Sequence, residues 1–123
     1  MTDETTHPYD RYVAAINHAD FDERLRGLAT AAHDTFAIRS PQYEAHGLRE
    51  ICEAVGRAMS AGGARVTLRR HSAIDEHHNI GRVEFEALDS AGNRLTTGLH
   101  IFERSGDRLA ALAVFIGASP PPK

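Results

Sequence analysis

Among the side chains that could do chemistry, His100 comes first because it lies in the apolar stretch GLHIF near the end of the chain. An unperturbed imidazole has a pKa of about 6.5, so it can act as a general acid or a general base near neutral pH. Burial lowers that pKa and favours the neutral ring, which can accept a proton or polarise a carbonyl. Three interpretations remain open: His100 is catalytic, it lines a pocket and contacts a ligand, or it is structural and paired with a polar neighbour.

Tyr12 and His71 are the next candidates, and each also has a structural interpretation. Tyr12 can donate a hydrogen bond to a ligand, but it lies on the apolar stripe of a predicted helix. A core tyrosine with a satisfied hydroxyl is equally expected there. His71 lies in a predicted strand, where its ring is solvated if the strand is regular and reaches a pocket only if the strand bulges.

Two adjacent histidines, His77 and His78, suggest a metal site, but their spacing argues against it. Neighbouring residues of a strand point to opposite sides, so both rings cannot readily bind one ion. The surrounding DEHHN segment is typical of a polar turn. The sequence has no zinc or iron motif, no glycine-rich phosphate loop and no G-x-S-x-G elbow. We therefore expect neither a metal site nor a cofactor.

Three segments with apolar residues at helical spacing are expected to help position these groups. The first covers residues 8–18 and starts with a proline, which suits a first helical turn. The second follows Asp20, which with Glu23 has the spacing of a capping box. The third covers residues 48–59, and a short strand around residues 36–38 precedes it.

From residue 64 onward the apolar period changes from about 3.6 residues to about 2, which indicates strands with one dry and one wet face. Phe85 falls on the dry face of one strand, and Phe102 shares the face of His100 on another. Leu99 and Ile101 make the opposite face of that strand apolar as well, which suggests that a partner covers it. Helices first and strands after predict an α+β fold, with three N-terminal helices on one face of a curved antiparallel sheet.

Length and composition are those of an ordinary globular chain. The 123 residues predict one domain over residues 8–117, with disordered segments at residues 1–7 and 118–123. The net charge of −3 gives no basis for binding nucleic acid or an anionic membrane. A single cysteine, Cys52, excludes an intramolecular disulfide. No apolar run is long enough to span a bilayer and the N-terminus is unlike a secretory signal, so we expect a cytoplasmic protein.

Several stretches carry a family resemblance: RYVAAINHADFDERL, FAIRSP and HGLREI, followed by GRVEFEALDSAGNRLTTGLHIFERSGDRLAALAVFIG. They resemble the nuclear transport factor 2-like superfamily, closest to its SnoaL-like and ketosteroid-isomerase-like branches, over residues 9–117. The resemblance implies a cone-shaped, cystatin-like fold with an apolar pocket, and a homodimer formed through the outer sheet face. It leaves the function open, because this fold hosts isomerases, cyclases, hydrolases, dehydratases and binding domains.

The resemblance also implies roles for particular positions. Tyr12 matches a tyrosine of the first helix that donates a hydrogen bond to the substrate oxyanion in ketosteroid-isomerase-like members. Ser40 stands where those members have a carboxylate as general base, and a serine cannot replace it without an activating group. His100 stands where they have a second carboxylic acid. Tyr43 and His46 lie in the loop that often forms the pocket rim.

Two functions follow as alternatives. In the first, which we favour because both family carboxylates are absent, the chain binds an apolar ligand of polyketide, steroid or terpenoid type. In the second, it is a cofactor-independent isomerase, cyclase, lyase or hydrolase that uses acid–base chemistry on such a ligand, with His100 and Tyr12 as catalytic residues. Contacts to the ligand are expected from five further side chains, Ser40, His71, Tyr43, Phe85 and Phe102.

Overall fold

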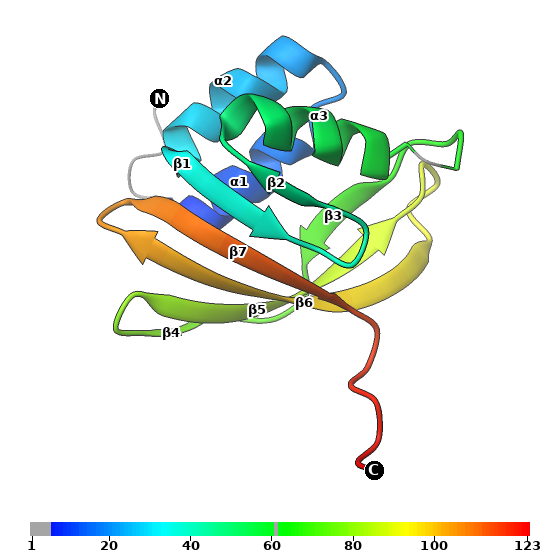
Figure 1. Ribbon diagram of the computed structural model, residues 1–123. Coiled ribbons are helices and arrows are strands. Elements are labelled where there is room, and N and C mark those ends of the chain that lie inside the picture. Colours follow the sequence, from blue (N-terminus) through cyan, green and yellow to red (C-terminus); the bar gives the residue numbers. More distant parts are fainter. Residues whose placement is uncertain (1–5, 61) are drawn as a thin grey trace.

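The computed structural model describes residues 6–60 and 62–123, in which helices pack on one side of a curved sheet (Figure 1). Within these residues the helices are α1 (Pro8–Ile16), α2 (Phe21–Ala31) and α3 (Leu48–Ala58). The strands are β1 (Ala32–Arg39), β2 (Glu44–His46), β3 (Thr67–Arg70), β4 (Asp75–His77), β5 (Ile80–Leu88), β6 (Arg94–Ser105) and β7 (Arg108–Ile116). The expected α+β class, with the helices on a cone-shaped curved sheet, is confirmed.

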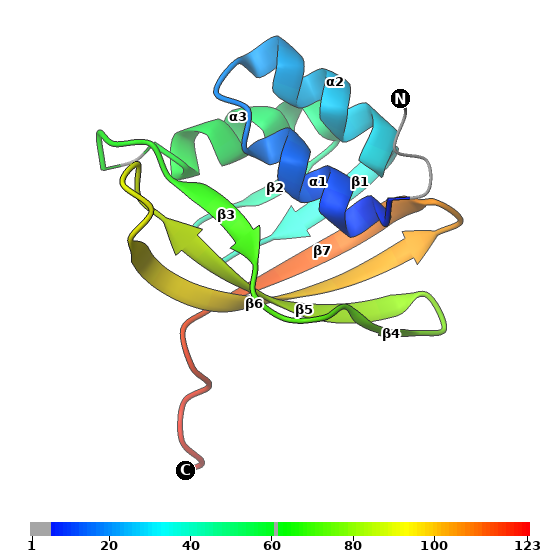
Figure 2. The ribbon, with the colours of Figure 1, turned by 180° about the vertical axis from the view of Figure 1, so that it is seen from behind.

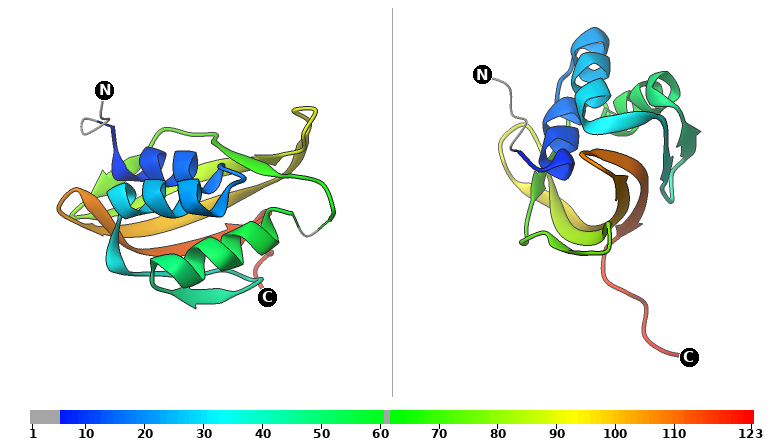
Figure 3. Two further views of the ribbon diagram at one scale, coloured as in Figure 1. Left: turned by 90° about the horizontal axis from the view of Figure 1, so that it is seen from above. Right: turned by 90° about the vertical axis from the view of Figure 1, so that its left-hand side faces the viewer.

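The strands follow one another across the sheet in the order β2-β1-β7-β6-β5-β3, and β4 also pairs with β5. β1 runs parallel to β7, so the sheet is mixed rather than wholly antiparallel. A tight hairpin would force two strands to pair in an antiparallel way. Because β1 and β7 are far apart in the chain and no hairpin joins them, they can pair in parallel. The end-on view in Figure 3 shows the sheet curling, and Figure 2 shows α1 along its concave side.

The polar DEHHN segment is part of a hairpin rather than a turn alone. Asp75–His77 forms β4, and His78 and Asn79 make the tight turn, with φ values of 50° and 67°. Two consecutive residues with positive φ are typical of a two-residue hairpin loop. The rings of His77 and His78 meet on this exposed hairpin. No group of three or more metal-ligating side chains is found among the residues that the structure describes.

Polar side chains cap the first two helices. Asp20 accepts a hydrogen bond from the Glu23 N–H at 2.9 Å, as the spacing of these two residues predicts. His7 caps α1, because its Nδ1 accepts from the Tyr9 N–H, and its Nε2 lies 2.9 Å from a carboxylate oxygen of Glu76. His7 is thus packed into the fold, one residue before the predicted start of the domain. The disorder expected at residues 1–5 lies outside the described residues.

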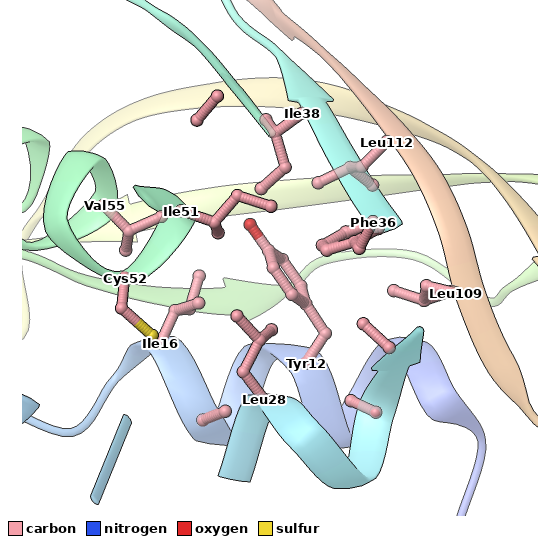
Figure 4. Close-up of a cluster of buried hydrophobic side chains, with 14 of the residues drawn as sticks. Tyr12, Ile16, Leu28, Phe36, Ile38, Ile51, Cys52, Val55, Leu109 and Leu112 are labelled. Atoms are coloured by element: carbon pink, nitrogen blue, oxygen red, sulfur yellow. The ribbon is translucent and has the colours of Figure 1, made fainter. Parts of the chain in front are cut away.

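The hydrophobic core lies between the helices and the concave face of the sheet (Figure 4). In it Tyr12 of α1 packs edge-on against Phe36 of β1, with 5.9 Å between the ring centroids. Cys52 of α3 is buried in this core, and burial raises the pKa of its thiol. The thiol is therefore held in its protonated, unreactive form.

The chain leaves the domain after β7, and residues 117–123 form no further helix or strand (Figure 1). These residues are exposed. None of the helices in the described part of the chain is long and apolar enough to cross a membrane.

Candidate functional site

A cavity of about 220 Å³ lies between the helices and the concave face of the sheet. Apolar side chains from both layers form its walls, among them Ile16, Val55 and Val114. Its mouth is marked by three exposed lining residues, Gln42 in the loop between β1 and β2, Leu95 near the start of β6 and Ile116 at the end of β7. Among the described residues no Asp, Glu, Lys or Arg lines it. The cavity can therefore hold an apolar molecule, with a few neutral polar groups to orient it.

Five of the residues singled out from the sequence line this cavity together. They are Tyr12, Ser40, Tyr43, Phe85 and His100. Tyr12 comes from α1, Phe85 from β5 and His100 from β6, so elements from both layers meet at the site. The candidate donors that the sequence places far apart thus face one space.

His71 and Phe102 do not line the cavity. His71 follows the end of β3, and its Nδ1 lies 3.9 Å from a carboxylate oxygen of Glu86, which projects from the convex face. Phe102 does share the concave face with His100, but its ring packs against His7 and Tyr9 instead. It stacks on Tyr9 at 5.9 Å between ring centroids. His46, expected at the rim, is exposed and bonds to Glu44 instead.

His100 is buried, with 1% of its surface exposed, and one of its nitrogens has a partner. Its Nδ1 lies 2.8 Å from the hydroxyl oxygen of Tyr9. The ring of Phe85 stacks on the imidazole at 4.2 Å between centroids, with 20° between the planes. Burial lowers the pKa of His100 to about 3, so the ring is neutral at physiological pH. A group with this pKa is a poor general base near pH 7.

Gly98 makes room for this stacked pair. It lies two residues before His100 on the same face of β6, opposite Phe85. A Cβ at this position would come within 2.4 Å of the Phe85 ring and of the Phe115 carbonyl oxygen. Because glycine leaves that space free, the Phe85 ring can lie flat on the strand and against the imidazole.

The two tyrosines of the cavity are neutral as well. Burial raises the pKa of Tyr12 well above its usual value, and it raises the pKa of Tyr43 to about 12. No hydrogen bond joins the hydroxyl of either residue to another residue in the described part of the chain. Both hydroxyls are therefore free to donate to a molecule in the cavity.

Ser40 occupies the rim, where the family resemblance expects a general base. Its backbone N–H donates to the Tyr43 carbonyl at 2.8 Å, and the Tyr43 N–H donates back, which closes the β1–β2 hairpin. Its hydroxyl accepts a hydrogen bond from the Gln42 N–H at 3.3 Å. No histidine or carboxylate bonds to this hydroxyl among the described residues, so nothing activates it.

Tyr9 is the residue of this region that sequence reasoning missed. It lies on the same buried stripe of α1 as Tyr12, and its side chain is fully buried. The sequence marks it only as one more apolar position of that helix. Its partner is 91 residues away, and nothing in the local pattern of either segment joins the two.

Comparisons with known proteins support the fold. No protein-family model and no curated protein matches the sequence. A proposed isomerase of the SnoaL-like family from Agrobacterium tumefaciens has a similar structure, with a TM-score of 0.81 at 17% identity over 90% of this chain and 95% of that one. A proposed polyketide cyclase from Sinorhizobium meliloti has a TM-score of 0.68 at 16% identity, over 87% and 92% of the two chains. A nuclear transport factor 2-like protein of unknown function from Cytophaga hutchinsonii has a TM-score of 0.64 at 11% identity, over 89% and 86%.

Proposed function

We propose that this chain, which has the fold of the nuclear transport factor 2-like proteins, binds an apolar small molecule in the cavity between its helices and its sheet. The observation that carries the proposal is the uncharged cavity itself, with apolar walls and neutral polar groups. Polyketide-, steroid- or terpenoid-type compounds have this chemistry. The cavity of about 220 Å³ is smaller than the pockets of about 300–1,000 Å³ that hold drug-sized ligands. We therefore expect a compound of one or two rings, or a longer one whose end projects from the mouth.

The test of binding uses a bicyclic hydrocarbon, indane, and two variants on one strand. Val114 of β7 lines the cavity opposite His100, whereas its neighbour Ala113 pairs with Ile101 on the convex face. Val114→Phe fills the cavity, and Ala113→Phe adds the same ring outside it. We expect saturable 1:1 binding of indane by calorimetry to the wild type and to Ala113→Phe, and its loss in Val114→Phe. Equal binding by the two variants, or none by the wild type, would contradict the proposal.

Acid–base catalysis on such a ligand is the second candidate function. It is favoured by one observation, that Tyr12, Ser40 and His100 line the same cavity. It is disfavoured by the low pKa of His100 and by the unactivated hydroxyl of Ser40. The two functions are separated by the exchange of the α-hydrogens of 1-indanone in D₂O, followed by NMR. If the chain only binds the ligand, the α-hydrogens should exchange as slowly as they do in buffer without protein. If it is a catalyst, they should exchange faster, and Tyr12→Phe should reduce that rate.

We also propose that a second copy of this chain is its binding partner. On the convex face, large apolar side chains from three neighbouring strands are exposed, with Ile80 on β5, Ile101 on β6 and Phe115 on β7. Exposed apolar patches of this kind are typical of protein interfaces. We expect a homodimer through this face, which leaves the cavity on the concave side accessible.

A further inference from the structure

We propose that Tyr9 fixes the tautomer of His100, so that the floor of the cavity presents an imidazole N–H and selects ligands that carry a hydrogen-bond acceptor. The acceptor is a carbonyl or an enolate or phenolate oxygen at the buried end of the ligand. This inference rests on the proposed function, since it assumes that the cavity holds a ligand. Tyr9 is a positioning residue here, because it does not line the cavity and acts through His100.

The proton of the Tyr9 hydroxyl decides the tautomer. His100 Nδ1, at 2.8 Å, is the hydrogen-bond partner of this hydroxyl in the described part of the chain, and both side chains are buried. If Nδ1 carried the imidazole proton, it would donate to Tyr9, and the Tyr9 O–H would be left as a buried donor without an acceptor. Such a donor has lost its hydrogen bonds to water and gained none in return, which disfavours this tautomer. The favoured arrangement has Tyr9 donating to Nδ1, which places the single proton of the neutral ring on Nε2.

The stability of both neutral forms supports this arrangement. Burial raises the pKa of Tyr9, so the hydroxyl keeps the proton that it donates. Burial also keeps the imidazole from accepting a second proton. The groups packed against the ring are Phe85, Tyr9 and Tyr12, none of which is charged.

Packing holds the imidazole in one orientation. Phe85 stacks on one side of the ring, in the space that Gly98 leaves free. Tyr9 is held by its own stacking on Phe102 and by the His7 cap at the start of α1. A ring flip of His100 would lose the Tyr9 hydrogen bond. Nε2 therefore keeps one position, and it has no hydrogen-bond partner among the described residues.

The unpartnered N–H makes the cavity selective. The Tyr12 hydroxyl is a second neutral donor on the wall of the same cavity. A ligand oxygen with lone pairs can accept from both donors. A ligand N–H without a lone pair cannot accept from the imidazole N–H, and it can only donate to a hydroxyl oxygen such as that of Tyr12. We expect a preference on the order of 10-fold for an acceptor over a donor of equal size, which corresponds to one net hydrogen bond.

The experiment combines a tautomer measurement with a matched set of ligands. The ¹⁵N chemical shifts of the imidazole rings report which nitrogen carries the proton, and no ligand is needed for them. Indane, 1-indanone and indole supply an apolar, an acceptor and a donor bicycle of similar size. The variants are Tyr9→Phe and, as a control, Tyr12→Phe, because Tyr12 contacts the imidazole without bonding to it.

In the wild type we expect the proton on Nε2 and an approximately 10-fold preference for 1-indanone over indole. Tyr9→Phe should give a mixture of tautomers and a preference that falls toward equal binding, with unchanged affinity for indane. Tyr12→Phe should leave the proton on Nε2. A wild-type proton on Nδ1, or an unchanged tautomer in Tyr9→Phe, would overturn the role of Tyr9. Equal binding of 1-indanone and indole to the wild type would overturn the selectivity.

Failure of the underlying function has a different signature. If none of the three bicycles binds while the NMR places the proton on Nε2, the proposed function fails and the tautomer assignment stands. If indane binds and the tautomer is the other one, the proposed function stands and this inference fails.

Discussion

His100 and Glu86 are buried polar residues on neighbouring strands of one sheet, and the structure accommodates them in opposite ways. His100 faces the concave side with 1% of its surface exposed, and Glu86 lies on the convex side with 5% exposed. The imidazole loses its charge, because burial lowers its pKa. The carboxylate keeps its charge, because hydrogen bonds from Arg69 and then Arg94 hold its pKa below the usual value.

The difference follows from what lies around each group. The guanidinium groups of Arg69 and Arg94 reach Glu86 at 2.7 and 3.0 Å from side chains that are themselves at least half exposed. Water therefore solvates the outer sides of both guanidinium groups, so the three charges are only partly desolvated. On the concave side the neighbours of His100 are aromatic rings and a neutral hydroxyl. A buried charge without a partner is costly, so the imidazole of His100 remains neutral. The contrast separates a side suited to an apolar ligand from a side that carries charge.

The largest expected effect is the loss of stability when a phenylalanine is truncated, which should be large on the concave side and small on the convex side. Phe85 is 2% exposed on the concave side, and Phe115 is 53% exposed on the convex side. We expect Phe85→Ala to lower the free energy of unfolding by about 3–5 kcal/mol, because it removes a buried ring and leaves a cavity. Phe115→Ala should change the unfolding of the monomer by no more than about 0.5 kcal/mol.

Urea unfolding of both variants over a range of protein concentrations measures this difference. If the proposed homodimer forms through the convex face, Phe115→Ala should also weaken association, as seen by light scattering. A loss in Phe115→Ala as large as that in Phe85→Ala at every concentration would show that the convex face is packed within one chain.

The next largest expected effect is a dependence of the free energy of unfolding on pH, which comes from His100 on the concave side. The pKa of His100 is about 3 in the folded chain and about 6.5 when unfolded, so the unfolded chain binds a proton that the folded chain does not. The contribution of His100 to stability is therefore complete above about pH 6.5 and is lost as the pH falls toward 3. The slope is about 1.4 kcal/mol per pH unit, which gives about 2 kcal/mol between pH 6.5 and 5.

Urea unfolding of the wild type and His100→Gln at these two pH values isolates the effect. The other seven histidines are present in both proteins and cancel in the difference. Glu86 does not interfere, because its pKa lies below the ordinary value of 4.5 and it stays charged in this range. Equal slopes for the two proteins would mean that His100 takes up a proton in the folded state as readily as in the unfolded state.

Much of the fold follows from periodicity in the sequence. The apolar stripe of α1, the cap at Asp20 and the alternation in β5 each depend on residues close in the chain, so local rules predict them. The parallel pairing of β1 with β7 depends on the whole topology. The two-residue hairpin at His78–Asn79 depends on an uncommon backbone conformation at residues other than glycine.

The same local rules predict less of the candidate site than of the fold. Alternation places His100 and Phe102 on one face, but their different surroundings depend on contacts with α1, where His7 and Tyr9 pack against Phe102 while His100 borders the cavity. The position of His71 depends on where β3 stops, at Arg70. The contact of Tyr9 with His100 joins segments 91 residues apart, and no local pattern encodes it.

The smallest effect is expected on the convex side, from Glu86→Gln. The glutamine keeps an oxygen that can accept from one guanidinium, and water solvates the arginines, which are already exposed. We expect a loss of stability smaller than the pH effect of His100, because ion pairs at exposed sites contribute little. That loss should shrink as salt is raised from low to about 1 M, since the charges are screened.

Glu84→Gln is the matched control, because Glu84 is exposed on the same face and strand. It should change stability less still. A large loss in Glu86→Gln that salt does not alter would mean that this carboxylate is as isolated from water as His100. The two sides of the sheet would then no longer differ in how they accommodate a buried polar group.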